Sequence, residues 1–439
     1  MKQITKIGLA FAIAFSALIF VNYQSHKTIT ITFGMFAGSN WDVPNGNCYQ
    51  IYENAIARFE KKYPNVKVEL ISGITKDDYV EWILEKSLQQ DIPDVFMVPS
   101  ESFDMFAQTG LLLNLESYMN EINENAFYQS SLKAGQYKDC QYALPFESVP
   151  TLMYVNKTLL EQENIDFPGN TWTWSDFYTI CEQVTKDTDG DGYLDQFGVY
   201  GYDWLLAAHS NNCEIMDENG NLHLNSTEMV ESIDFMKKLV ALNQNIEVNS
   251  QDFDEGKVAF CPMKFSEYRA YKPYPWRVKK YSNFEWDALM LPAGTHGDNT
   301  SQINTLSMGI SRFSSNKEIA WEFLKELTYS EECQNEIITL SQGVPVLQNV
   351  ASSKETMDLL SDDSPGDSNF QFIMLDEVMK QGTPMDLFTQ YDEIISQIDA
   401  EIYRIVINHS DNTLMELTDI QQKIQTKSGT VIYWLSLYL

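Results

Sequence analysis

The sequence predicts an α/β fold in two domains, with parallel-type sheets that helices flank on both faces. Strand and helix patterns alternate after residue 27. The chain has 439 residues with 44% hydrophobic content, and a single hydrophobic core stops growing near ~250–300 residues. In residues 142–163 an apolar run passes two prolines and then becomes an amphipathic helix. Two cores joined by such a segment explain these features together.

The alternation is clearest in the first part of the chain. Strand patterns occupy residues 28–33, 66–71 and 94–98, and helix patterns occupy residues 49–63, 77–89 and 102–109. This βαβαβα order predicts a parallel sheet between two layers of helices. Ligands of such sheets gather beyond the carboxyl ends of the strands. We therefore expect binding residues in the loop 38–46 and at residues 99–101.

Residues 142–163 are the predicted crossing between the domains. Pro145 and Pro150 favour extended backbone in the residues before them, and residues 151–155 are β-branched or aromatic. Asn156 can then cap a helix that begins near Lys157. A strand that leads from one domain into a helix of the next would serve as a hinge.

The charge balance excludes one class of partner. Thirty basic residues against 62 acidic ones give a formal net charge of −32. This charge repels phosphate backbones and, at long range, anionic membrane surfaces. We expect no nucleic-acid partner, and we interpret the acidic surface as an aid to solubility.

The amino terminus predicts export from the cytoplasm. Lys2 and Lys6 precede the uncharged run 7–21, which is the layout of a secretory signal. The run is shorter than the ~20 residues of a membrane span, and no small-x-small cleavage site follows it. Residues 1–27 are therefore predicted as a signal or an N-terminal membrane anchor on an extracellular or cell-surface protein. The six widely spaced cysteines are predicted mostly as free thiols.

Seven motifs along residues about 28 to about 425 carry a family resemblance. In order they read PNVKVEL, PDVFMVPSESFDMFAQTGLLLNLESYM, YALPFESVPTLMYVNKTLL, TWTWSDF, WDALMLPAG, LSMGISRFSSNKEIAWEFLKEL and QGVPVL. Together they resemble the extracellular solute-binding proteins of sugar-type ABC importers, the maltodextrin-binding-like family. The resemblance implies a monomer that binds a carbohydrate between two lobes and docks on permease subunits.

The resemblance also implies a periplasmic-binding-protein-like fold of type II with three hinge crossings. These crossings would lie near residues 145–150, 304–310 and 343–346. The N-terminal lobe would then comprise residues 28–146 plus 305–345, and the C-terminal lobe residues 147–304 plus 346–439.

The chain departs from the family pattern at two places. No cysteine for lipid attachment follows the apolar run 7–21, which leaves membrane attachment to the segment itself. The Gly-Trp pair that often follows a strand of the second lobe is replaced here by the stretch 261–266. The sugar-stacking role of that tryptophan would pass to Phe265 or Tyr268.

Candidate ligand residues combine aromatic planes with polar groups. The C–H faces of sugar rings pack on aromatic rings, while the hydroxyls need carboxylates, amides or arginine. Any one aromatic residue is also compatible with core packing, so placement in strand-following loops decides the choice. The resemblance favours Glu101 most, because an acidic residue at the matching position binds sugar hydroxyls. The predicted ligand-binding residues are Trp41, Asp42, Glu101, Glu147, Asp203, Trp204, Phe265, Tyr268, Arg269 and Trp276.

A second motif predicts a calcium loop. Residues 187–195 match the first nine positions of an EF-hand loop, with glycine at the sixth position. The twelfth position, where a bidentate glutamate belongs, is Gly198. A structural Ca²⁺ and a hydrated acidic turn therefore remain the two alternatives. The predicted ligands are Asp187, Asp189, Asp191, Asp195 and the main-chain carbonyl of Tyr193.

The sequence argues against an enzyme. Glu101 and Glu147 would suit a glycosidase if they lay ~5–10 Å apart, but chance pairs are expected among 62 acidic residues. No nucleophile-elbow, zinc-protease or phosphate-loop motif is present. We therefore predict a solute-binding protein that delivers a carbohydrate, with a membrane-tethered ligand sensor as the alternative.

Overall fold

The computed structural model describes residues 28–41, 43, 49–217, 220–244, 246–270, 284–362, 373–385, 391–408 and 411–438. The predictions for residues 1–27, for Asp42 and for Trp276 lie outside these ranges. Within these ranges, no helix combines the length and the apolar character that a membrane crossing requires.

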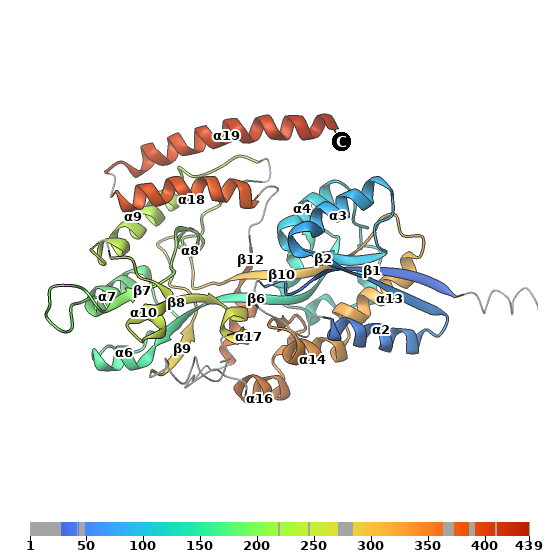
Figure 1. The fold of residues 1–439 in the computed structure, drawn as a ribbon, viewed down its shortest axis with the longest axis horizontal. Coiled ribbons are helices and arrows are strands. Elements are labelled where there is room, and N and C mark those ends of the chain that lie inside the picture. Colours follow the sequence, from blue (N-terminus) through green and yellow to red (C-terminus); the bar gives the residue numbers. More distant parts are fainter. Residues whose placement is uncertain are drawn as a thin grey trace, which may run out of the picture.

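The first part of the chain forms the predicted alternation of strands and helices. Its elements are β1 (Ile29–Ala37), α2 (Gln50–Lys62), β2 (Val66–Thr75), α3 (Lys76–Leu88), β3 (Val95–Val98), the 3₁₀ turn η1 (Ser100–Ser102) and α4 (Phe103–Gln108). β1 pairs in parallel with both β2 and β3. Figure 1 shows α3 and α4 on one side of these strands and α2 on the other.

The remaining elements complete both lobes and the connections between them. They are η2 (Met119–Glu121), η3 (Glu124–Ala126), α5 (Gln129–Lys133), β4 (Gln136–Tyr137), β5 (Cys140–Gln141), β6 (Ala143–Asn156), α6 (Lys157–Gln162), α7 (Trp174–Val184), β7 (Phe197–Val199), α8 (Trp204–Ser210), α9 (Thr227–Ala241), α10 (Ser250–Asp254), β8 (Val258–Lys264), α11 (Phe265–Ala270), β9 (Trp286–Leu289), β10 (Gln302–Ile310), α13 (Lys317–Thr328), α14 (Glu331–Leu340), β11 (Val344–Pro345), α15 (Gln348–Ala351), α16 (Lys354–Asp362), α17 (Ile373–Gln381), β12 (Thr383–Pro384), α18 (Tyr391–Ile407) and α19 (Thr413–Tyr438).

The predicted crossing at residues 142–163 is one long strand, β6, followed by α6. Its first part pairs with β10, and its second part pairs with β8 and β9. Phe146 belongs to one hydrophobic cluster and Val155 to another. Asn156 ends the strand and caps α6, since its side chain accepts a hydrogen bond of 3.0 Å from the Leu159 amide. We call the β1–β3 side of β6 the first lobe and the β7–β9 side the second lobe.

The sheet that joins the lobes is mixed. Its strand order is β2-β1-β3-β10-β6-β8-β7. β1 is parallel to β2 and β7 is parallel to β8, but β6 is antiparallel to β8 and β9, and β10 is antiparallel to both β3 and β6. The antiparallel pairs arise because β6 leads from the first lobe to the second while β10 returns. The α/β architecture is as predicted.

The chain returns to the second lobe later than the predicted boundary at residue 346. β11 pairs with β6, and Val346, Val350 and Val378 then pack in the cluster that contains β1 and β3. β12 next pairs with β10, and only the residues of α18 and α19 join the other cluster. α15 packs on β11 and α14, and α17 packs on α5, so the described chain stays with the first lobe as far as β12 and joins the second lobe again at α18.

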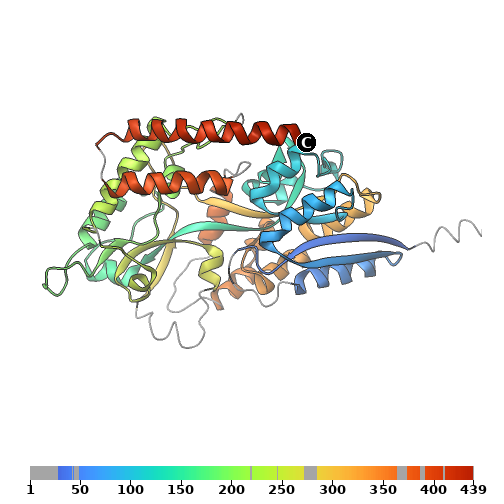
Figure 2. The same ribbon diagram turned by 45° about the horizontal axis from the view of Figure 1, so that its top comes forward.

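The two last helices cover the outside of the second lobe. Both views show α18 and α19 lying together along this lobe, on the side where α9 also packs (Figures 1 and 2). Leu417, Ile420 and Ile424 of α19 are buried there. The five cysteines within the described ranges are free thiols, as predicted: Cys140, Cys181, Cys213, Cys261 and Cys333.

Candidate functional site

A small hollow with a cavity volume of about 20 Å³ lies beside the carboxyl ends of β1 and β3, where the sheet topology predicts ligands. Its walls come from β1 and the loop after it, from α2, and from the hinge strands β6 and β10. The end of α14 closes it. The lining residues are Phe36, Gly38, Ser39, Asn40, Ile51, Tyr52, Met97, Phe146, Glu147, Leu306, Leu340 and Ser341. We call it the Glu147 hollow.

Glu147 is the buried acid of this hollow. Only 3% of the residue is exposed, and its carboxylate accepts a short hydrogen bond from the Ser341 hydroxyl. Burial raises the pKa of Glu147 to about 7, although Ser341, Trp41, Arg269 and the Gly343 amide all favour the charged form. A buried carboxylate of this kind needs hydrogen-bond donors, which is the role that ligand hydroxyls can fill.

Gly343 allows the main chain to approach this carboxylate. A side chain at position 343 would collide with Oε2 of Glu147. The residue therefore stays without a Cβ so that its amide can reach the acid. The QGVPVL motif contains this glycine, but no pattern in the sequence pairs it with Glu147.

Arg269 brings the second lobe to the same place. It lies on α11, and its guanidinium donates to the carbonyls of Ser341 at 2.8 Å and Ile338 at 2.5 Å. These carbonyls belong to the last turn of α14, where helix carbonyls lack partners and the helix dipole is negative. Burial lowers the pKa of Arg269 to about 10, and Glu147 opposes this effect. A cation of one lobe thus binds a helix end of the other.

Trp41 completes the group. It follows β1, is 3% exposed, and its amide donates to the Ser39 hydroxyl at 3.1 Å. The indole N–H favours the charged form of Glu147, yet among the described residues it makes no hydrogen bond of standard geometry. Three predicted site residues from distant parts of the chain therefore interact: Glu147 lines the hollow, and Trp41 and Arg269 act on its carboxylate from behind that lining.

Phe265 and Tyr268 support this group from the core. Tyr268 stacks on Tyr154 with ring centroids 5.2 Å apart and on Phe265 with centroids 5.8 Å apart. All three rings are buried. The stack fixes α11 against β6, so these residues position Arg269 and present no free ring face to a ligand.

Asp203 and Trp204 have structural contacts at the start of α8. The Asp203 carboxylate accepts a hydrogen bond of 2.9 Å from the Leu206 amide, which caps the helix. The Trp204 indole donates to Asp399 at 2.9 Å and so joins α8 to α18. Neither residue lines the Glu147 hollow.

A second hollow, with a cavity volume of about 180 Å³, lies on the other side of β10. Its wall contains Thr305, whereas Leu306 faces the Glu147 hollow, and successive strand residues point to opposite faces. Glu101 lies in η1 beside Ser100, which lines this second hollow. The lining residues are Ser100, Phe103, Asp104, Lys133, Ala134, Gln136, Ile303, Thr305, Pro384 and Met385. We call it the Asp104 hollow.

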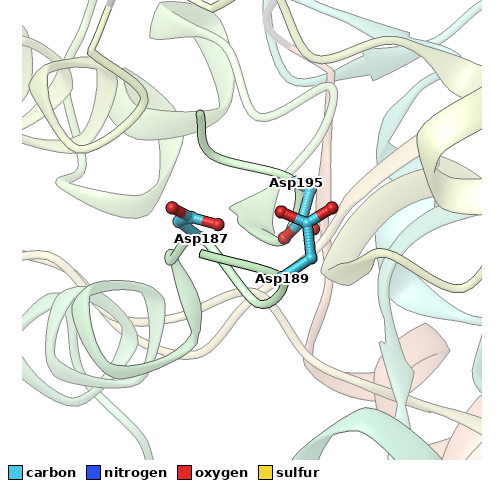
Figure 3. Close-up of side chains that lie close together, drawn as sticks. All are labelled: Asp187, Asp189 and Asp195. Atoms are coloured by element: carbon cyan, nitrogen blue, oxygen red, sulfur yellow. The ribbon is translucent and has the colours of Figure 1, made fainter. Parts of the chain in front are cut away.

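The predicted calcium loop gathers three of its four carboxylates. Oxygens of Asp187, Asp189 and Asp195 lie within 4.8 Å of one another, and Figure 3 shows the three side chains in the loop between α7 and β7. The Gly192 and Gly190 amides donate to Asp187 at 2.7 Å, which lowers its pKa. Carboxylate oxygens at this spacing fit the hard oxygen shell that Ca²⁺ prefers.

Two positions of the calcium motif differ from an EF-hand. The Asp191 carboxylate lies outside the cluster of three and accepts the Tyr193 amide at 2.9 Å. Gly198, at the twelfth position, packs directly on Cys181 of α7, which leaves no room for a glutamate. The donor set therefore fits a partial shell that water would complete.

The family is shown by comparison with known proteins. Residues 46–332 match the family model described as bacterial extracellular solute-binding protein. The arabinooligosaccharide-binding protein of Bacillus subtilis (strain 168) is 22% identical over 333 residues, which cover 71% of this chain and 73% of the relative. Its namesake from Halalkalibacterium halodurans is 23% identical over 231 residues, 50% of this chain and 47% of that relative. This chain thus spans about half the length of that relative.

Solved structures share the fold. The ABC substrate-binding protein Lmo0181 from Listeria monocytogenes in complex with cycloalternan superposes with a TM-score of 0.66 at 19% identity, over 92% of this chain and 100% of that one. UspC of M. tuberculosis gives a TM-score of 0.73 at 15% identity, over 90% and 99% of the two chains.

Proposed function

Since this chain belongs to the bacterial extracellular solute-binding protein family, we propose that it captures an oligosaccharide between its lobes and delivers it to an ABC importer. One observation carries the proposal. Trp41 on the first-lobe side and Arg269 of the second lobe both act on the carboxylate of Glu147, which lines the hollow. Contacts from both lobes to a single site exist only when the lobes are closed, so a ligand held there favours closure.

The chemistry of the Glu147 hollow suits a saccharide. Glu147 can accept hydrogen bonds from sugar hydroxyls, and the Asn40 side chain offers both a hydrogen-bond donor and an acceptor. Tyr52 and Phe146 line the same hollow, so part of its wall is apolar. The names of the relatives, arabinooligosaccharide-binding and cycloalternan-bound proteins, support an oligosaccharide as the ligand class.

Closure would occur by rotation of the lobes about β6 and β10. Arg269 then reaches the end of α14, and water leaves the space around Glu147. Permease subunits would bind the closed form and then receive the ligand. The family resemblance implies this sequence of steps.

A saccharide panel tests the proposed function. Thermal shift with arabino-, malto- and cyclic oligosaccharides should raise the melting temperature for at least one class. Trp41→Ala and Glu147→Gln should each weaken binding of that saccharide about tenfold or more, because each removes a polar group that the ligand would otherwise satisfy. Tyr193→Ala, at a residue that is 73% exposed and remote from the hollow, is the control. A peptide or polyamine that stabilises the protein where no saccharide does would contradict the proposal.

We also propose that residues 1–27 direct export and anchor the protein to the membrane on its extracellular side. Lys2, Lys6 and the uncharged run 7–21 support this role, and no cysteine is available behind the run for a lipid. Alkaline extraction of membranes should leave the full-length protein bound and release a variant that lacks residues 1–27. Release of both would contradict the anchor.

A further inference from the structure

We propose that the Asp104 hollow is a second binding site, which takes a single neutral sugar ring and is distinct from the Glu147 hollow. The two hollows lie on opposite faces of β10. The strand separates them, so one ligand cannot occupy both. The walls of the Asp104 hollow join α4 and α5 of the first lobe to β10 and β12, which are two of the segments that connect the lobes.

Asp104 is the residue of this hollow whose carboxylate lacks hydrogen-bond donors within the described chain, and a ligand could supply them. Its side chain is partly buried, and burial alone raises its pKa. Among the described residues, no hydrogen bond or ion pair reaches this carboxylate. A partly desolvated carboxylate without hydrogen-bond donors lowers the stability of the folded protein. A bound molecule that donates hydrogen bonds to it would offset this loss.

The floor around Asp104 is already organised. The Ser100 hydroxyl donates to the Thr305 carbonyl at 2.9 Å. The Thr305 hydroxyl lies 2.9 Å from that of Ser148, which in turn lies 2.8 Å from that of Ser131. These hydroxyls hold β10, β6 and α5 together. The floor is therefore a fixed surface on which a ligand can be oriented.

The lining selects a neutral molecule with hydroxyl donors. Asp104 is the acid inside, which disfavours an anion, and Lys133 at the exposed mouth disfavours a simple cation. Phe103, Ile303 and Pro384 provide an apolar wall. A pyranose combines an apolar C–H face with hydroxyls that can donate to a carboxylate and accept from an ammonium group.

Occupancy of this hollow should bias the hinge. Ile303 of β10 is paired with Pro384 of β12, and both line the hollow. Ser148 links the floor to β6 directly beside Glu147. A sugar that contacts both connecting segments would favour one relative orientation of the lobes. This coupling rests on the proposed function, whereas the second site itself does not.

Monosaccharide binding to the full-length protein tests the site. Saturation-transfer NMR with D-glucose, D-galactose and L-arabinose should show one of them bound. Asp104→Ala should weaken this binding about tenfold or more, since it removes the charged acceptor. Gln136→Trp, which places a bulky side chain in the lining of the hollow, should do the same. Asp139→Ala, at an exposed acid outside the hollow, is the matched control.

The outcomes separate this site from the Glu147 hollow. Loss of monosaccharide binding in Asp104→Ala and Gln136→Trp, with melting temperatures like that of the control, supports the second site. Three results overturn it: none of the three sugars binds, both variants bind them as the control does, or Glu147→Gln alone abolishes the binding. Oligosaccharide affinity measured on the same variants reports on the proposed function separately.

Discussion

Replacing Arg269 by methionine tests whether this side chain holds the lobes closed. The substitution keeps an unbranched apolar stem beside Tyr268 but removes the guanidinium, which donates to the Ile338 and Ser341 carbonyls at the end of α14. Both bonds join α11 of the second lobe to α14 of the first, so both are lost when the lobes open. The change should therefore act on closure and ligand affinity and leave the fold of each lobe intact.

The magnitude follows from these two bonds. A hydrogen bond to a charged group contributes ~1.5–3 kcal/mol. Taking the lower value for each bond, because the carbonyls and the guanidinium regain water in the open form, gives about 3 kcal/mol of closure free energy. Each ~1.4 kcal/mol corresponds to a factor of ten in affinity. Ligand affinity should therefore fall about 100-fold.

Titration calorimetry with the saccharide identified by the panel measures this loss, and small-angle scattering reports the lobe separation. Arg404→Met is the matched control, because Arg404 is exposed and pairs only with Glu401 of its own helix at 3.4 Å within the described residues. An Arg269→Met variant that binds within about threefold of the wild type, with an unchanged radius of gyration, would refute the role of Arg269 in closure.

Three further predictions concern Gly343, Glu147 and the acidic loop. Gly343→Ala should cost ~1–3 kcal/mol of unfolding free energy in urea because its methyl group collides with Glu147, whereas Gly169→Ala, with open space around it, should cost little; equal midpoints would contradict the collision. The folded-state pKa of Glu147 is raised to about 7 from 4.5, so the folded state binds the extra proton between these values and stability falls as pH rises through this window. The melting temperature of the wild type should thus drop relative to Glu147→Gln between pH 5 and 7.5, and parallel profiles would exclude this linkage. Calcium titration should raise the melting temperature of the wild type but not of Asp187→Asn, and no binding heat in the wild type would disprove the site.

The hinge strand and the alternation of elements were predictable because local residues determine them. Prolines at 145 and 150, the β-branched run after them and the Asn156 cap all act within a few residues, and the structure confirms each as part of β6 or the start of α6. The convergence of Trp41, Glu147 and Arg269 was predictable only in part. The three residues were proposed singly, from strand-following loops and from the family resemblance.

Tertiary contacts decide what the sequence could not supply. Ser341 and Gly343 reach Glu147 because β11 pairs with β6. No local sequence pattern predicts that strand pairing. The described chain stays with the first lobe as far as β12 because α15 packs on β11 and α14 and α17 packs on α5. Asp203 and Trp204 follow a strand, as binding residues often do, but one caps α8 and the other anchors it to α18.

The long strand β6 also has a consequence for how the protein comes apart. Leu144 and Phe146 serve one hydrophobic cluster, and Met153 and Val155 serve the other, within fourteen consecutive residues. If either cluster unfolds, β6 loses its support on that side. The strands that pair with β6 on the other side then lose an ordered partner. The two lobes should therefore unfold in a single cooperative transition, and neither can be excised as a contiguous, independently stable fragment. The segment that lets the lobes move relative to one another is also the one that makes them thermodynamically inseparable.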